Sequence, residues 1–374
     1  MKRLKSLKSL RIGDLKISLP IVQGGMGVGI SLSGLASAVA NEGGVGVISS
    51  AGLGLLYRRL SPDYCKASIL GLKEELRKAR ERTRGVIGVN VMVAMSNFAD
   101  MVRTSIAERA DIIFSGAGLP LDLPSYLDGR SRTKLVPIVS SVRAFRLICQ
   151  KWTNGYDYLP DAVVVEGPKA GGHLGYKREE IDNGAFSLEK TLPEVVACAR
   201  EWSDRYGKPI PVIAAGGIYT GEDIYRIMEL GASGVQLGTR FVTTEECDAA
   251  EGFKQAYIAS RKEDIGIIQS PVGMPGRAIS SEFIRNVEQG LERPRTCAFH
   301  CIRTCDYKKS PYCIMLALYN AARGNFRHGY AFCGANAYLA DRITTVRETI
   351  STLVGEYRER RERARNEAAE RWKK

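Results

Sequence analysis

Short apolar runs alternate with longer amphipathic stretches along the chain up to about residue 240. The runs are rich in valine, isoleucine and alanine, and residues that favour turns flank them. A short run of this kind between turn residues predicts a buried strand. The predicted strands lie at residues 20–23, 45–49, 86–92, 111–115, 135–140, 162–166, 211–215 and 234–238.

The stretches between these strands carry apolar residues at helical spacing. Eight strands that alternate with helices are the count of a (β/α)8 barrel. The sequence therefore predicts an α/β protein built on a TIM barrel. A doubly wound open sheet is the alternative, because strand counting can miss an element. The predicted helices lie at residues 32–41, 66–82, 98–109, 142–151, 192–206 and 221–230.

Length and pattern divide the chain into three parts. An α/β barrel commonly takes about 250 residues, and this chain has 374. We expect the barrel at 1–245, a smaller and mainly helical domain with clustered cysteines at 246–334, and a C-terminal helix at 335–374 that packs back on the barrel. The apolar positions that suit such packing are Ile343, Val346, Ile350 and Leu353.

The formal net charge of +13 raises the question of a nucleic-acid partner. Much of the charge lies at the two ends, in Lys2, Arg3 and Lys5 and in the run 358–365, where arginine alternates with glutamate. Such alternation is typical of a solvated helix. Because no recognition motif accompanies the charge, we expect no nucleic-acid partner.

The chain also lacks the patterns of membrane and secreted proteins. No apolar run approaches the roughly 20 residues of a membrane span, and the N-terminus has no continuous apolar region typical of a secretory signal. We therefore expect a cytoplasmic protein that does not associate with membranes. In that reducing compartment, clustered cysteines are more typical of metal binding than of disulfides.

A glycine-rich loop, residues 166–175, follows the sixth predicted strand and presents His173, one of three histidines in the chain. Histidine is the side chain whose unperturbed pKa lies near neutrality, which suits proton transfer. A tight turn with a structural histidine would give the same local pattern. Functional groups of TIM barrels lie on the loops that follow the strands, so the position of His173 favours a catalytic role.

Two further loops have the composition of a phosphate site. Ala215-Gly216-Gly217 follows the seventh predicted strand and Gly238-Thr239 follows the eighth. Barrels of this kind often bind phosphate at these two loops, through backbone N–H groups near a short helix. The alternative is a pair of ordinary tight turns. The sequence thus predicts a phosphorylated cofactor.

Five segments in register carry a specific resemblance: residues 20–27, 88–90, 166–175, 214–218 and 238–241. Together they resemble the nitronate monooxygenase (2-nitropropane dioxygenase) family, which includes flavin-dependent enoyl-acyl-carrier-protein reductases and whose members are FMN-binding TIM barrels. The resemblance implies FMN as cofactor and His173 as the catalytic histidine. It implies flavin contacts at Gly24, Gly25, Met26, Gly27, Asn90, Glu166, Gly171, Gly172, Ala215, Gly216, Gly217, Gly238 and Thr239, with Gly334 and Asn336 close to the cofactor.

The resemblance leaves three functions open. We favour oxidation of an alkyl nitronate with O2, in which His173 deprotonates a neutral nitroalkane or positions the anion. The second is NAD(P)H-dependent reduction of an enoyl thioester, in which a histidine assists protonation of the α-carbon. The third is a flavin-binding or metal-binding module without turnover, against which the intact His173 loop argues. A small-molecule substrate is expected, and a homodimer is left open.

Four cysteines lie close together after the barrel, with the spacing C-x3-C-x3-C-x7-C. Thiolates can bind an iron–sulfur cluster or zinc, and four suffice for either. We favour a [4Fe–4S] cluster over zinc and over inert buried cysteines. The i, i+4 spacing predicts that the first two share a helix face with the third one turn beyond. The four are Cys297, Cys301, Cys305 and Cys313; Cys149 and Cys198 are expected in the core.

Overall fold

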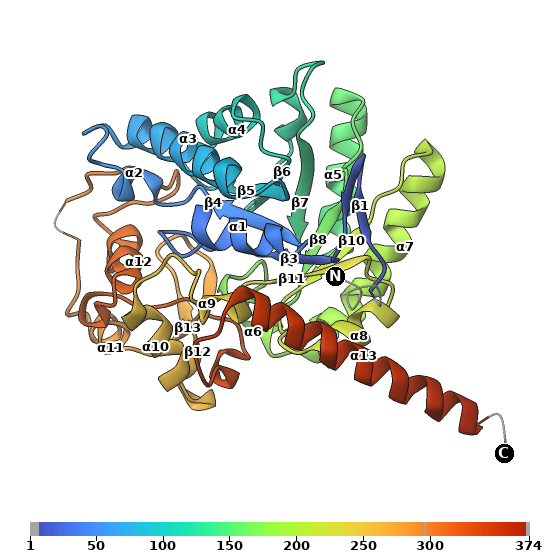
Figure 1. Ribbon diagram of the computed structural model, residues 1–374. Coiled ribbons are helices and arrows are strands. Elements are labelled where there is room, and N and C mark those ends of the chain that lie inside the picture. Colours follow the sequence, from blue (N-terminus) through green and yellow to red (C-terminus); the bar gives the residue numbers. More distant parts are fainter. Residues whose placement is uncertain (1–6, 295, 372–374) are drawn as a thin grey trace.

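The structure, a computed structural model, describes residues 7–294 and 296–371. Eight parallel strands close into a barrel (Figure 1). The last strand pairs with the first, where Gln236 lies opposite Val22. This closure confirms the predicted TIM barrel and excludes the doubly wound sheet. The strands are β3 (Ile21–Gln23), β4 (Val45–Ser49), β5 (Val86–Met92), β6 (Ile112–Gly116), β7 (Lys134–Val139), β8 (Val163–Glu166), β10 (Val212–Ala215) and β11 (Gly234–Leu237).

The helices around the barrel begin at residues that suit helix N-termini. The side chains of Asp63, Ser141 and Thr220 each accept a hydrogen bond from a backbone N–H in the first turn of the helix that follows. Leucine, isoleucine and tryptophan side chains on the inner faces pack against the strands. These helices are α1 (Ser33–Asn41), α2 (Leu53–Leu56), α3 (Tyr64–Arg82), α4 (Phe98–Ala107), α5 (Val142–Tyr156), α7 (Leu188–Tyr206) and α8 (Gly221–Glu229).

A hairpin of two short strands, β1 (Leu10–Ile12) and β2 (Leu15–Ile17), precedes the barrel. Its buried side chains join the cluster inside the barrel, beside residues such as Val22 and Ile112 near the start of their strands. The hairpin therefore closes the end of the barrel opposite the loops predicted to be functional. The basic residues Lys2, Arg3 and Lys5 lie outside the described residues.

The chain beyond the barrel gathers at one side of it (Figure 1). This part contains helices and also an antiparallel pair of strands, which the sequence did not predict. That pair extends to a third strand, β9 (Gly172–His173), in the loop after β8. A short helix, α6 (Arg178–Ile181), follows β9 in the same loop. The elements beyond the barrel strands are α9 (Thr239–Val242), α10 (Glu251–Ala259), β12 (Ile265–Gln269), β13 (Pro275–Ile279), α11 (Glu282–Glu288) and α12 (Ile314–Ala322). Short 3-10 turns lie at Leu123–Tyr126, Gly184–Phe186, Lys262–Asp264, Phe326–His328 and Ala337–Leu339.

The last helix, α13 (Val346–Arg371), packs against α8 and α1. The Glu356 carboxylate accepts a 2.6 Å hydrogen bond from the backbone N–H of Gly221 at the start of α8. Ile350 and Leu353 are buried in this contact, whereas the second half of the helix extends away from the body of the protein (Figure 1). Among the described residues, no helix is long and apolar enough to cross a membrane.

Candidate active site

A cavity of about 300 Å³ lies at the carboxyl ends of the barrel strands. Loops of the barrel form one side, and the chain beyond the barrel forms the other through residues such as Val272, Ile302 and Phe332. The lining includes His173 and every cofactor-contact residue expected from the sequence except Asn336. These residues are Gly24, Gly25, Met26, Gly27, Asn90, Glu166, Gly171, Gly172, Ala215, Gly216, Gly217, Gly238, Thr239 and Gly334.

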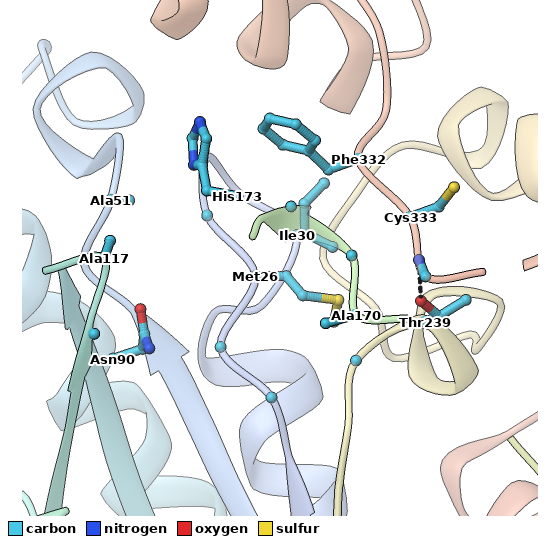
Figure 2. A pocket seen from close by; sticks show the side chains of 18 of the residues that line it. Met26, Ile30, Ala51, Asn90, Ala117, Ala170, His173, Thr239, Phe332 and Cys333 are labelled. Carbon is cyan, nitrogen blue, oxygen red and sulfur yellow. Dashed lines mark hydrogen bonds between the residues drawn. The ribbon is translucent and has the colours of Figure 1, made fainter. Parts of the chain in front are cut away.

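His173 borders this cavity, with Phe332 beside it (Figure 2). Its Nε2 lies 2.7 Å from Oγ of Ser270. Its ring meets the Phe332 ring edge to face, with 4.9 Å between centroids. Burial lowers the pKa of His173 to about 4, because a desolvated imidazole resists protonation. At neutral pH the imidazole is therefore uncharged, with a fixed orientation.

The glycine-rich loop takes its shape from partners on both sides of the chain. The Arg277 guanidinium, buried on β13, donates hydrogen bonds to the carbonyl oxygens of Pro168 and Ala170. The Leu174 N–H donates to the Pro275 carbonyl oxygen at 2.8 Å. Strand β13 therefore fixes the loop that carries His173.

Glu166, the last residue of β8, lies at the same cavity. Burial raises the pKa of its carboxyl group to about 7, because the desolvated carboxylate is disfavoured. The cavity thus holds one group that resists gaining a proton and one that resists losing it. Paired groups with opposite pKa shifts are typical of acid–base sites.

The turn after β10 requires glycine. Gly216 and Gly217 have φ angles of 95° and 80°, in the left-handed region that side chains disfavour. A Cβ atom on Gly216 would lie 2.7 Å from the Gly167 carbonyl oxygen. The turn therefore brings bare backbone to the cavity. Asn336 lies outside the cavity lining and supports this turn, since its Nδ2 donates a 2.8 Å hydrogen bond to the Gly217 carbonyl oxygen.

The loop after β11 is tied to the distant end of the chain. Thr239 Oγ1 accepts a 2.8 Å hydrogen bond from the Gly334 N–H (Figure 2). The Thr239 hydroxyl proton remains available for an acceptor in the cavity. Together with the Gly216-Gly217 turn, this loop forms one polar, backbone-rich end of the site.

The residues present fit FMN. The backbone-rich end has the donor chemistry of a phosphate site, and Met26, Ile30 and Ala51 supply apolar surface suited to a planar ring. Gly25 lies directly against Asn90, since a Cβ atom on Gly25 would lie 2.4 Å from Asn90 Cβ. The cavity thus combines a polar end with apolar surface.

Sequence reasoning missed part of the cavity. Gln236 is a polar residue within the otherwise apolar strand β11, a signal that could have identified it. Ser270 carries no comparable signal, because its role depends on the fold that brings it to His173. Several apolar lining residues also carry no sequence signal that marks them as part of the site. They are Met92, Met95, Ile302, Ile314, Met315, Leu318 and Phe332.

The prediction that Cys297, Cys301 and Cys305 lie on one helix is wrong. Residues 296–313 form no helix, and His300 adopts a left-handed φ of 44°. Pro294 and Pro311 flank the segment and disfavour helix there. All nine cysteines of the chain are free, and Cys149 and Cys198 are buried in the core as predicted.

The four clustered cysteines line a second cavity of about 280 Å³. Over residues 7–294 and 296–371, no group of three or more His, Cys, Asp or Glu side chains is arranged to hold a metal ion. A zinc ion needs its ligands to converge within about 2.3 Å of one point. The described residues therefore show neither the expected iron–sulfur cluster nor a zinc site.

Comparisons with solved structures agree with the fold. FabK from Thermotoga maritima matches with a TM-score of 0.71 and 27% identity, over 94% of this chain and 96% of that chain. A nitroalkane oxidase from Streptomyces ansochromogenes matches with a TM-score of 0.70 over 92% of this chain and 97% of that chain. At 23% identity, the latter is evidence of a shared fold alone.

Relatives are also found by sequence. A probable nitronate monooxygenase of Staphylococcus haemolyticus is 27% identical over 74% of this chain and 79% of its own length. A protein of Mycobacterium tuberculosis named (3aS,4S,5R,7aS)-5-hydroxy-7a-methyl-1-oxo-octahydro-1H-indene-4-carboxyl-CoA dehydrogenase is 28% identical over 73% of this chain, and the match spans 66% of that protein. The family model for nitronate monooxygenase matches residues 8–356. This match covers nearly the whole chain, which therefore belongs to the nitronate monooxygenase family of oxidoreductases.

Proposed function

We propose that the chain is an FMN-dependent oxidoreductase that oxidises alkyl nitronates with O2 and uses His173 for proton transfer. The observation that carries this proposal is the neutral imidazole of His173, held by Ser270 and Phe332 at the edge of the cavity. The uncharged imidazole has an unprotonated nitrogen at neutral pH, which can hold a nitronate or take a proton from a carbon acid, although its lowered pKa makes it a weaker base than a solvated histidine. That direction of proton transfer suits oxidation of a nitroalkane or its anion.

The cavity residues would divide the cofactor between them. Gly216, Gly217, Gly238 and Thr239 would hold the phosphate through backbone N–H groups and one hydroxyl. Gly25, Met26, Asn90 and Glu166 would contact the rest of the cofactor. When bound, FMN would supply the redox chemistry of the oxidation.

The chain itself would manage the proton and exclude water. His173 would remove the proton from the carbon beside the nitro group, or hold the nitronate by a hydrogen bond. Ser270 fixes the imidazole through its contact with Nε2. Phe332 covers the other side of the ring and keeps it desolvated, so that the base stays unprotonated at neutral pH.

The test is flavin reduction by stopped-flow absorbance under anaerobic conditions. Propyl-2-nitronate, NADH and NADPH are each mixed separately with the holoenzyme. Rapid bleaching of the flavin by the nitronate, followed by reoxidation on admission of O2, is the expected result. Rapid reduction by a nicotinamide without any response to the nitronate would refute nitronate oxidation.

A thioester substrate is the second candidate, because the cavity has an extended apolar wall. Met92, Met95, Met315 and Leu318 line the cavity, and an acyl chain would bury well against them. One relative is named as a carboxyl-CoA dehydrogenase. This candidate predicts reduction of the flavin by NADH or NADPH and its reoxidation by an enoyl thioester. A protein that binds flavin and responds to none of these compounds would be a module without turnover.

A further inference from the structure

The four clustered cysteines surround one cavity although they lie on an irregular loop. Cys297, Cys301, Cys305 and Cys313 all line it, and each thiol lies within electrostatic range of the other three. None is paired in a disulfide. Four free thiols on a loop without regular structure therefore border one space of about 280 Å³. Such an arrangement suits a bound ligand.

We propose that Cys297, Cys301, Cys305 and Cys313 bind a [4Fe–4S] cluster beside the flavin cavity. Each iron of such a cluster takes one thiolate, so the four sulfurs surround the cluster instead of converging on one point. The four thiols line one cavity of about 280 Å³. A space of that size suits a cluster of several atoms better than one zinc ion.

Donor groups near the sulfurs support an anionic ligand. Cys313 immediately precedes α12, and the backbone N–H groups of Met315 and Leu316 point at its sulfur. The His300 N–H donates a hydrogen bond to Cys297 Sγ at 3.4 Å. Hydrogen bonds to sulfur stabilise thiolate-bound iron.

The proposed site shares a wall with the flavin cavity. Ile302 and Ile314 line both cavities. The cysteine loop is docked on the segment after β5, where the Ser96 N–H donates to the Cys301 carbonyl oxygen at 3.1 Å and the Arg303 N–H donates to the Ala94 carbonyl oxygen at 3.0 Å. A one-electron centre would therefore lie next to the proposed flavin. The binding of the cluster does not depend on the proposed function.

The test measures iron and acid-labile sulfide in the full-length protein, purified anaerobically and reconstituted with ferrous iron and sulfide. We expect about four of each per chain, together with an EPR signal of a reduced cluster after dithionite treatment. Cys305→Ala and Cys297→Ala should each lose most of the iron and the signal. Cys198→Ala is the matched control, because Cys198 lies in the barrel core, and it should retain both.

Three outcomes would overturn the proposal. They are wild-type protein without iron after reconstitution, stoichiometric zinc in its place, and full iron content in both Cys305→Ala and Cys297→Ala. Flavin content and circular dichroism show whether each variant is folded. Protein with flavin and without iron would refute the cluster alone, whereas protein with iron and without flavin would refute the proposed function alone.

Discussion

His173 Nε2 lies 2.7 Å from Oγ of Ser270, which is 97 residues further along the chain. The contact fixes the imidazole orientation, so Ser270 is a positioning residue. We expect Ser270→Ala to lower kcat roughly tenfold, the effect of losing about 1.4 kcal/mol of hydrogen-bond energy in the transition state. Flavin affinity should not change, and Ser270→Thr should restore part of the rate. Equal kcat in Ser270→Ala and wild type would show that the contact is only structural.

Replacement of His173 tests its role as the base. His173→Ala should lower turnover of a neutral nitroalkane by about 10² to 10⁴, while flavin content stays at the wild-type level. His328→Ala is the control, because His328 lies on an exposed turn and should leave the rate unchanged. Steady-state kinetics together with the flavin absorbance of each variant measure both quantities. A normal rate for His173→Ala would remove the proposed catalytic role.

The depressed pKa of His173 predicts the pH dependence of proton abstraction. The base is active when unprotonated, and burial lowers its pKa to about 4. The value of kcat/KM for a neutral nitroalkane should therefore rise with pH through about 4 and show no step near 6.5, the pKa of a solvated imidazole. A pH–rate profile at constant ionic strength measures this in Glu166→Gln, which lacks the cavity carboxyl group whose pKa is about 7. A single step near 6.5 in that variant would mean that the ring is solvated.

The raised pKa of Glu166 predicts a change of stability with pH. Burial raises this pKa from 4.5 to about 7, so the stabilising contribution is present below pH 4.5 and is lost as pH rises through 7. Glu166→Gln removes the charge. Urea unfolding of the flavin-free protein should show Glu166→Gln gaining about 2 kcal/mol over wild type between pH 5 and pH 8. An equal difference at both pH values would contradict the shift.

The glycine turn after β10 predicts a loss of cofactor binding on substitution. Gly216→Ala places a methyl group 2.7 Å from the Gly167 carbonyl oxygen, at a φ of 95°. We expect a loss of stability of about 1–3 kcal/mol and weaker flavin binding, measured by fluorescence titration. Gly184→Ala is the control, because no atom lies within 4 Å of its added Cβ. Wild-type affinity in Gly216→Ala would argue against a phosphate contact at this turn.

The sequence was sufficient to predict the barrel because its strands are buried on both faces. Strands such as β4 and β8 are apolar up to a polar last residue, so local composition predicts their position directly. The loops that follow the strands all lie at one end of a TIM barrel. Once the strands were predicted, His173 could therefore be assigned to that end.

The rest of the site depends on contacts between distant segments. The pairing of β9 with β13 and the approach of Phe332 to His173 have no local signal. The cysteine spacing matched the period of a helix, but flanking prolines and a left-handed His300 prevent one. Neither strand of the β1–β2 hairpin exceeds three residues, too few to show a clear alternation.

The hydrogen bond between Gly334 and Thr239 spans 95 residues and bears on the order of events during synthesis. All eight barrel strands have been synthesised by residue 237, well before Gly334, Asn336 or β13 has been made. A nascent chain of that length has all the strands of the barrel, but the later residues that contact its glycine-rich loops have not been made. Flavin capture should therefore be a late event, and ribosome-stalled chains that end before residue 330 should remain colourless after incubation with FMN and removal of the excess.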